Sequence, residues 1–148
     1  MSSVLAGRRI VVTRAAEQAD ELADLLEQRG AIPVVIPLIE IVSGPSEVAQ
    51  LAEHVENSYD WLIVTSPNGA RCVFETAIQI PTATRVAAIG TATAEALRVG
   101  GVEVAFVPAV QSAAGLLAEF PGVPSRVLVV QAAQAERTLA EGLAAQQF

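Results

Sequence analysis

The chain has 148 residues, 52% of them hydrophobic, and a net charge of −7. This length suits a domain with its own core, and the hydrophobic content excludes global disorder. The nine basic residues are all Arg, so a Schiff-base or P-loop lysine is excluded. The single cysteine, Cys72, allows no internal disulfide and no cysteine-based zinc cluster. The acidic balance argues against non-specific binding of nucleic acid.

Short apolar runs alternate with amphipathic segments along the whole chain. The runs are rich in Val, Ile and Ala, which is typical of parallel strands that are covered on both faces. We expect strands at 9–13, 32–36, 61–65, 85–89, 103–107 and 126–130, with 38–42 continuing extended. We expect helices at 17–29, 47–55, 68–78, 91–99, 113–120 and 136–145. This order predicts an α/β fold with parallel sheets and right-handed crossovers.

Local residue types set several of these boundaries. Gly30 and the pair Gly100-Gly101 follow predicted helices and are expected to end them. Ser46 and Ser112 precede predicted helices and are expected to cap them. Pro33 has no N–H group, so we place it at the start or edge of its strand. A doubly wound sheet would continue after 136–145 with another strand, so we expect the chain to be a piece of a longer protein.

Two turns carry the most specific chemical signal. The apolar run 61–64 stops at Thr65, Ser66, Pro67 and Asn68, and the run 86–89 stops at Gly90, Thr91 and Thr93. Both turns place hydroxyls and backbone N–H groups at the carboxyl end of a strand and the start of a helix, where anions are favoured. Neither turn holds Lys, His or Cys. We therefore predict a site that binds carboxylates and works without a cofactor.

Ordinary structural roles compete with this interpretation. Ser66 followed by Pro67 is also a common helix start, and Asn68-Gly69 is ordinary turn chemistry. Thr91 and Thr93 have the same ambiguity. The acidic residues of 17–27 are expected to form a solvated helix face and not a metal site.

Two arginines are further candidates for binding an anion. Arg14 follows the first strand, where a cation facing a cleft would pair with carboxylates; its alternative role is to balance the acidic helix. Arg137 lies near the start of the last helix, where a cation opposes the helix dipole. His54, late on a helix, is expected to be solvated.

Several segments together resemble the uroporphyrinogen-III synthase family. The resemblance spans essentially the whole chain, and it rests on the order and spacing of its motifs more than on any single one. The segments are Gly7–Ala15 with the following Leu-rich helix to Ala31, Pro37–Ile41, Tyr59–Gly69, Ala88–Ala94, and Arg126–Gln131 with Arg137 and Leu139.

The resemblance implies two flavodoxin-like α/β domains joined by two crossovers, the first being discontinuous. On that pattern, residues 1–37 belong to an incomplete domain one, and residues 38–148 form domain two without its last strand. It also implies a substrate-binding set with no residue assigned to catalysis and no metal. That set is Thr13, Arg14, Thr65, Ser66, Asn68, Gly90, Thr91, Thr93 and Arg137.

The implied function is a cofactor-free lyase of tetrapyrrole (heme) biosynthesis. Such an enzyme cyclises hydroxymethylbilane to uroporphyrinogen III and inverts the terminal ring. The alternative is a non-catalytic tetrapyrrole-sensing or regulatory module. We expect a cytoplasmic protein with no membrane partner, and with no nucleic-acid partner unless a DNA-binding domain is fused to it.

Overall fold

The structure is a computed structural model that describes residues 4–42, 44–57, 59–75 and 79–148. It divides into two compact units, Met1–Val42 and Ser43–Phe148, which are described separately below. Residues 38–42 therefore group with the first unit. The expected assignment of 1–37 and 38–148 to the two domains of the family stays a prediction.

The first unit is a strand–helix–strand body. It contains β1 (Arg9–Val12), a 3-10 turn η1 (Ala16–Gln18), α1 (Ala19–Gln28) and β2 (Ile32–Val35). The two strands are parallel, with Arg9 opposite Ile32 and Val12 opposite Val35. Gly30 has a φ of +77°, the left-handed conformation that glycine adopts without a steric penalty, and so ends the helix segment as predicted.

Pro33 lies where its missing N–H group costs no hydrogen bond. Ile32 N–H donates to Arg8 O at 2.8 Å, and Ile36 N–H donates to Val12 O at 2.9 Å. Because successive N–H groups of a strand point to opposite sides, the Pro33 nitrogen points away from β1. The edge position predicted for this proline is confirmed.

The second unit is built on a three-stranded parallel sheet. Its strands are β3 (Trp61–Val64), β4 (Arg85–Ala88) and β5 (Val127–Val130), in the order β4-β3-β5. Val64 lies opposite Ala88 on one side and opposite Val130 on the other. The predicted parallel pairing of these three strands is confirmed.

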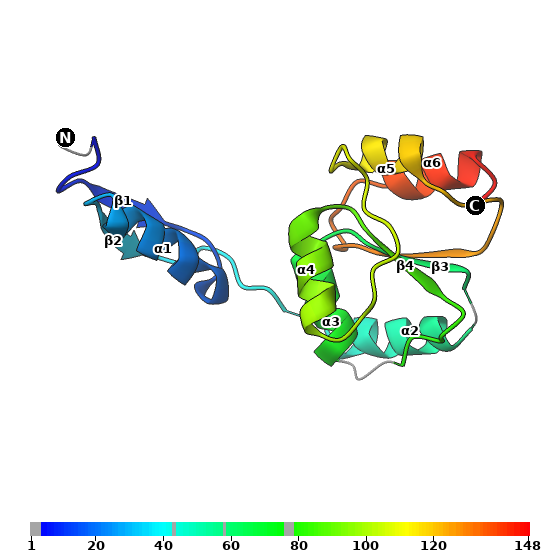
Figure 1. The fold of residues 1–148 in the computed structure, drawn as a ribbon. Coiled ribbons are helices and arrows are strands. Elements are labelled where there is room, and N and C mark those ends of the chain that lie inside the picture. The colour runs from blue at the N-terminus through cyan, green and yellow to red at the C-terminus, as the bar shows by residue number, and fades with distance from the viewer. Residues whose placement is uncertain (1–3, 43, 58, 76–78) are drawn as a thin grey trace. The chain divides into compact units, whose positions relative to one another are not determined.

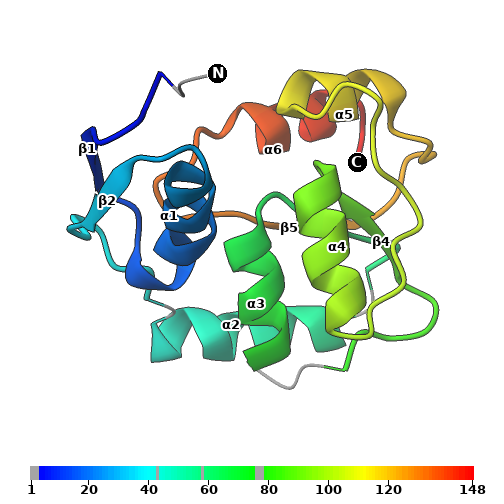
Figure 2. The same ribbon diagram turned by 60° about the vertical axis from the view of Figure 1, so that its left-hand side comes forward.

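Helices cover both faces of this sheet. Alternate side chains of the strands, including Leu62, Val64 and Val86, pack under α3 (Pro67–Glu75) and α4 (Thr91–Val99). The intervening side chains, including Trp61 and Ile63, pack under α5 (Ala113–Glu119) and α6 (Thr138–Ala145). Figures 1 and 2 show α3 and α4 side by side, with α5 and α6 across the sheet from α3. The fold class is therefore α/β with a doubly wound parallel sheet, as expected.

Two local expectations about structure are wrong. The segment 103–107 does not form a strand. It makes one isolated parallel bridge, Ala87 to Phe106, at the outer side of β4. Pro108 follows this bridge and has no N–H group with which to extend a ladder. Helix α2 (Pro45–Glu56) begins before Ser46, with Gly44 at the N-cap and Pro45 in the first turn, because the fixed φ of proline suits that position.

The remaining helices differ from their predicted ranges only at their ends. Ser112 is the N-cap of α5, and its Oγ accepts from Gly115 N–H at 3.0 Å, as predicted. Helix α4 spans the predicted residues, and α6 begins two residues later than expected, at Thr138. Residues 76–78 of the predicted helix 68–78 lie outside the described residues. In the first unit, residues 38–42 do not form a strand. Among the helices described, none is long and apolar enough to cross a membrane.

Candidate functional site

Three turns leave the second unit's sheet at the same edge. Ile89 N–H, after β4, donates to Val64 O at 3.1 Å, and Thr65 N–H, after β3, donates to Val130 O at 3.1 Å. The chain leaves β3 toward β4 on one side and later returns to β5 on the other. The order of the strands thus reverses between β3 and β5, and open α/β sheets bind ligands outside the carboxyl ends of strands at such a point.

The Thr65 hydroxyl joins β3 to β5 at this edge. Its Oγ1 donates to Val130 O at 3.1 Å, and the side chain is half-buried. The hydroxyl proton is therefore used within the protein, and the Thr65 oxygen is left as an acceptor. Donation from Thr65 to a substrate carboxylate would require this bond to break.

Ser66 has the N-cap role that competed with its proposed ligand role. Its Oγ accepts from Gly69 N–H at 3.1 Å. Because Ser66 accepts this bond, its own hydroxyl proton remains for donation, so capping and ligand binding are compatible. Helix α3 also lies close to the strands here: a Cβ on Gly69 would lie 3.3 Å from Val64 Cγ1 and 3.4 Å from Val130 Cγ1.

The sequence interpretation missed Arg71, a cation that lies beside the start of α3. The Arg71 guanidinium donates through Nη2 to Asn68 Oδ1, which holds it toward the first turn of the helix. A cation near a helix N-terminus interacts unfavourably with the helix dipole, and a bound anion would offset this cost. The signal that could have identified Arg71 is its place in the first turns of the helix, the argument that was applied to Arg137.

The start of α4 is covered by a loop side chain. Gly90 is the N-cap and has no side chain to accept from the helix. Instead, Gln111 Oε1 accepts from Thr91 N–H at 3.0 Å and from Thr91 Oγ1 at 3.2 Å. Gln111 is a second residue that sequence reasoning missed, because it lies 20 positions from its partner and no local pattern links the two.

Thr93 and Arg137 differ in their access to this edge. Thr93 is buried, with 3% of its surface exposed, so its side chain is part of the packed interior around α4. Arg137 is the exposed N-cap residue of α6 and follows β5. The substrate roles predicted for both residues stay predictions.

Thr13 and Arg14 lie in the first unit, directly after β1. Both are exposed, and Thr13 O accepts from Leu38 N–H at 3.2 Å. A hollow of about 430 Å³ lies nearby, and its lining includes the acidic residues Glu17 and Glu40. Ionised Glu17 and Glu40 would repel an anion. The hollow is therefore less suited to a carboxylate than the turns of the second unit are.

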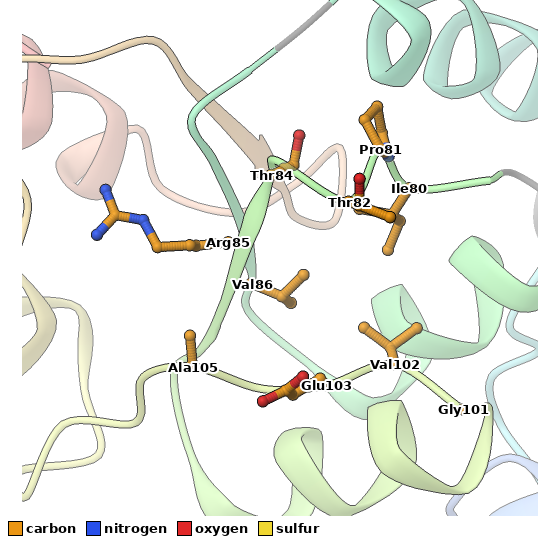
Figure 3. A pocket seen from close by; sticks show the side chains of 10 residues that line it. All are labelled: Ile80, Pro81, Thr82, Thr84, Arg85, Val86, Gly101, Val102, Glu103 and Ala105. Carbon is orange, nitrogen blue, oxygen red and sulfur yellow. The ribbon is translucent and has the colours of Figure 1, made fainter.

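A second open hollow, of about 520 Å³, lies at the opposite end of the second unit's sheet (Figure 3). Two of its polar lining residues are engaged elsewhere: Thr84 Oγ1 donates to Tyr59 O at 2.7 Å, and the Arg85 guanidinium lies 4.2 Å from the Trp61 ring centroid. Figure 3 shows the Arg85 side chain pointing away from Ile80 and Val102. This hollow lies at the amino end of β4, so it is separate from the turns after the strands.

The structure thus brings five of the predicted residues to one edge of the sheet: Thr65, Ser66, Asn68, Gly90 and Thr91. They offer backbone N–H groups, a serine hydroxyl and, through Asn68, a guanidinium. In the described part of the chain, no group of three or more His, Cys, Asp or Glu side chains could hold a metal ion.

The sheet order and the chemistry of this edge define a doubly wound α/β protein with a candidate anion site at its switch point. The family model described as uroporphyrinogen-III synthase HemD matches residues 20–148. The chain belongs to the uroporphyrinogen-III synthase family.

Individual relatives agree with this assignment. The chain is 33% identical over 144 residues to a porphyrin biosynthesis protein HemD of Ruminiclostridium josui, covering 90% of this chain and 28% of the relative. It is 31% identical over 126 residues to a uroporphyrinogen-III synthase of Synechococcus elongatus, covering 79% of this chain and 47% of the relative. The chain therefore spans less than half of the length of these two relatives.

Solved structures share the fold. Two crystal structures of uroporphyrinogen III synthase from Thermus thermophilus match the chain, the wild type with a TM-score of 0.61 and 19% identity, and a mutant with a TM-score of 0.67 and 18% identity. Each match covers 96% of this chain, and 58% and 59% of the respective solved chains. This likeness supports the two-domain α/β fold expected from the sequence.

Proposed function

We propose that the full-length protein containing this chain is a uroporphyrinogen-III synthase, a cofactor-free lyase of tetrapyrrole biosynthesis. The observation that carries the proposal is that α3 and α4 both begin at the carboxyl edge of the sheet, with hydroxyl residues Ser66 and Thr91 at their starts, and that α3 follows β3, the strand beside the point where the order reverses. Membership of the synthase family supports the same activity.

The proposed reaction converts hydroxymethylbilane to uroporphyrinogen III and water. The substrate loses its hydroxyl group as water, which leaves an azafulvene cation. The terminal ring attacks this cation through its substituted position and forms a spiro intermediate. The bond between the terminal ring and its original methylene bridge then breaks, that methylene bonds instead to the other α-carbon of the ring, and loss of a proton completes the macrocycle with the ring inverted.

The role proposed for this chain is to bind and orient the substrate. The acetate and propionate groups of hydroxymethylbilane are anionic, and the starts of α3 and α4 offer N–H donors and favourable dipole ends. The substrate is intrinsically reactive, so holding its two ends together can supply much of the catalysis, up to about 7–11 kcal/mol in favourable cases. A strong nucleophile is not needed for such a reaction.

Arginines add positive charge to this proposed site. Arg71 stands beside Asn68 at the start of α3, and Arg137 begins α6 after β5. A guanidinium binds a carboxylate with two parallel hydrogen bonds, which fixes orientation as well as adding affinity. Thr13 and Arg14, which belong to the first unit, are also proposed to bind substrate.

Product analysis tests this proposal against the regulatory alternative. The full-length protein is given hydroxymethylbilane, and the uroporphyrinogen isomers are separated. A synthase yields the type III isomer. A sensing module would leave only the type I isomer of the uncatalysed closure. The relatives described above are named for synthesis or biosynthesis, which favours the first result. The cytoplasm is the proposed location.

A further inference from the structure

We propose that Asn68 is a positioning residue, which holds the Arg71 guanidinium at the carboxyl edge of the sheet and leaves its positive charge unneutralised for a substrate carboxylate. This inference rests on the proposed function. It gives Asn68 an action through Arg71, in place of the direct contact with substrate that the sequence interpretation predicted. It starts from the hydrogen bond that Arg71 Nη2 donates to Asn68 Oδ1.

Asn68 lies on a closely packed part of the fold. It is the second residue of α3, and the Ser66 side chain caps this turn by accepting from Gly69 N–H at 3.1 Å. A Cβ on Gly69 would lie 3.3 Å from Val64 Cγ1, so the start of the helix packs closely on β3. Residues three positions apart share one face of a helix. The short Asn68 side chain therefore restrains the long Arg71 side chain before any ligand binds, which lowers the entropy that binding would otherwise cost.

The Arg71 guanidinium has a neutral partner and no counter-ion. Within the described residues, it forms no ion pair with a carboxylate and no second hydrogen bond. The Asn68 and Arg71 side chains are both half-buried, and a cation that is partly withdrawn from water without a counter-ion is unfavourable. Its place near the start of α3 adds to this cost through the helix dipole. An anionic ligand would offset both costs.

The remaining donors of Arg71 suit a carboxylate. An arginine has five N–H groups in a planar fork, and the bond to Asn68 uses one of them. Two parallel N–H groups are left for a bidentate bond to an acetate or propionate group. A carboxylate in place of the Asn68 amide would also orient the guanidinium, but it would neutralise the charge that attracts the substrate. The neutral amide thus provides orientation without loss of charge.

The substitution Asn68→Asp separates substrate affinity from stability. In the full-length protein, we expect it to raise the KM for hydroxymethylbilane by about 10- to 30-fold, within the range for loss of a charged hydrogen bond. We expect the melting temperature to rise, because a carboxylate near a helix start is favoured by the dipole and pairs with Arg71. A merely structural role for Asn68 would move stability and substrate affinity in the same direction. A KM within about twofold of the wild type would overturn the inference.

The matched control is Asn57→Asp, the same chemical change at the C-cap of α2. Asn57 is exposed and precedes β3, at the amino end of the sheet. The added charge should leave KM within about twofold of the wild type, because repulsion between exposed charges is screened over a Debye length of about 8–10 Å. The melting temperature should fall, since an anion at a helix C-terminus opposes the dipole. An equal rise in KM for both variants would assign the effect to net charge and overturn the inference.

A double-mutant cycle tests whether Asn68 acts through Arg71. Asn68→Ala should raise KM by about three- to tenfold, because the Arg71 side chain then has to be ordered when the substrate binds. In a protein that already carries Arg71→Ala, the same substitution should change KM by less than about twofold, because no guanidinium is left to position. Equal factors in both backgrounds would show that Asn68 acts on the substrate directly and would refute the positioning role.

A binding titration separates this inference from the proposed function. Uroporphyrin III, the oxidised and fluorescent form of the expected product, is titrated into the wild type and the members of the cycle. A wild type that forms no type III isomer, but loses affinity for uroporphyrin III in the same non-additive way, would contradict the function and support the positioning role. Type III production with additive losses would contradict the positioning role alone. A wild type that neither reacts nor binds contradicts both.

Discussion

Thr65 Oγ1 donates a hydrogen bond to Val130 O at 3.1 Å, across the point where the order of the strands reverses. The same carbonyl also accepts from Thr65 N–H at 3.1 Å. One residue therefore fixes the spacing of β3 and β5 directly beneath the candidate site. The Thr65 side chain, which is proposed to bind substrate, therefore also links β3 to β5.

Replacing Thr65 should affect stability more than turnover. Thr65→Val retains the shape and the backbone N–H bond, and loses one neutral hydrogen bond. We expect the free energy of unfolding to fall by about 0.5–1.5 kcal/mol and kcat to fall by less than about threefold. Urea unfolding and the isomer assay measure the two effects, and Thr65→Ser, which keeps the hydroxyl, should retain most of the stability. Unchanged stability with a kcat loss above about tenfold would instead place the hydroxyl on the substrate.

Ser66 should show two separable effects. Ser66→Ala removes the acceptor for Gly69 N–H and should cost about 0.5–2 kcal/mol of stability, as for other helix caps. Loss of one neutral donor should slow turnover by about tenfold or less. Ser66→Thr is the matched control, because it keeps a capping hydroxyl. Complete loss of type III product in a folded Ser66→Ala protein would show that this hydroxyl does proton-transfer or covalent chemistry.

Arg71 should contribute to substrate affinity. Arg71→Ala removes a cation beside Asn68, and we expect the KM for hydroxymethylbilane to rise by about 10- to 100-fold, the range for loss of a charged hydrogen bond. Stability should change little, because a cation near a helix start is not favoured by the dipole. Arg98→Ala, in the last turn of α4, removes the same charge and serves as the control. Equal KM values for the two variants would contradict a binding role for Arg71.

Trp61 offers a prediction about the core alone. Its side chain is 1% exposed, and among the described residues its Nε1–H has no hydrogen-bond partner. Trp61→Phe removes that buried donor, whose desolvation costs about 1–3 kcal/mol, and this gain offsets much of the packing that is lost. We expect a net change within about 1 kcal/mol, against about 3–5 kcal/mol lost for Trp61→Ala. Similar losses for both variants in urea unfolding would show that the indole N–H is satisfied.

Local sequence signals predicted most of the second unit. The Ser112 cap and the helix 91–99 follow from side chains close in sequence, and the Val-rich runs correctly indicated parallel strands covered on both faces. The Ser46 cap failed because Pro45, one residue earlier, already suits the first turn. The strand expected at 103–107 is reduced to one bridge, which depends on its place outside β4 and on Pro108 after it.

The candidate site was less predictable, since it depends on contacts between distant residues. The turns after β3 and β4 could be aligned from the rule for parallel strands. The Gln111–Thr91 and Thr65–Val130 hydrogen bonds could not, because each depends on where a loop or a later strand lies in three dimensions. The burial of Thr93 likewise depends on which face of α4 packs inward.

The central claim is that the carboxyl edge of β3 and β4 binds the tetrapyrrole. The most direct test is backbone amide NMR of the full-length protein during titration with uroporphyrin III. The account predicts that the largest shift changes fall on residues 65–71, 90–93 and 111. Changes concentrated instead on residues 80–86 and 101–105, which include the lining of the hollow at the amino end of β4, would contradict it.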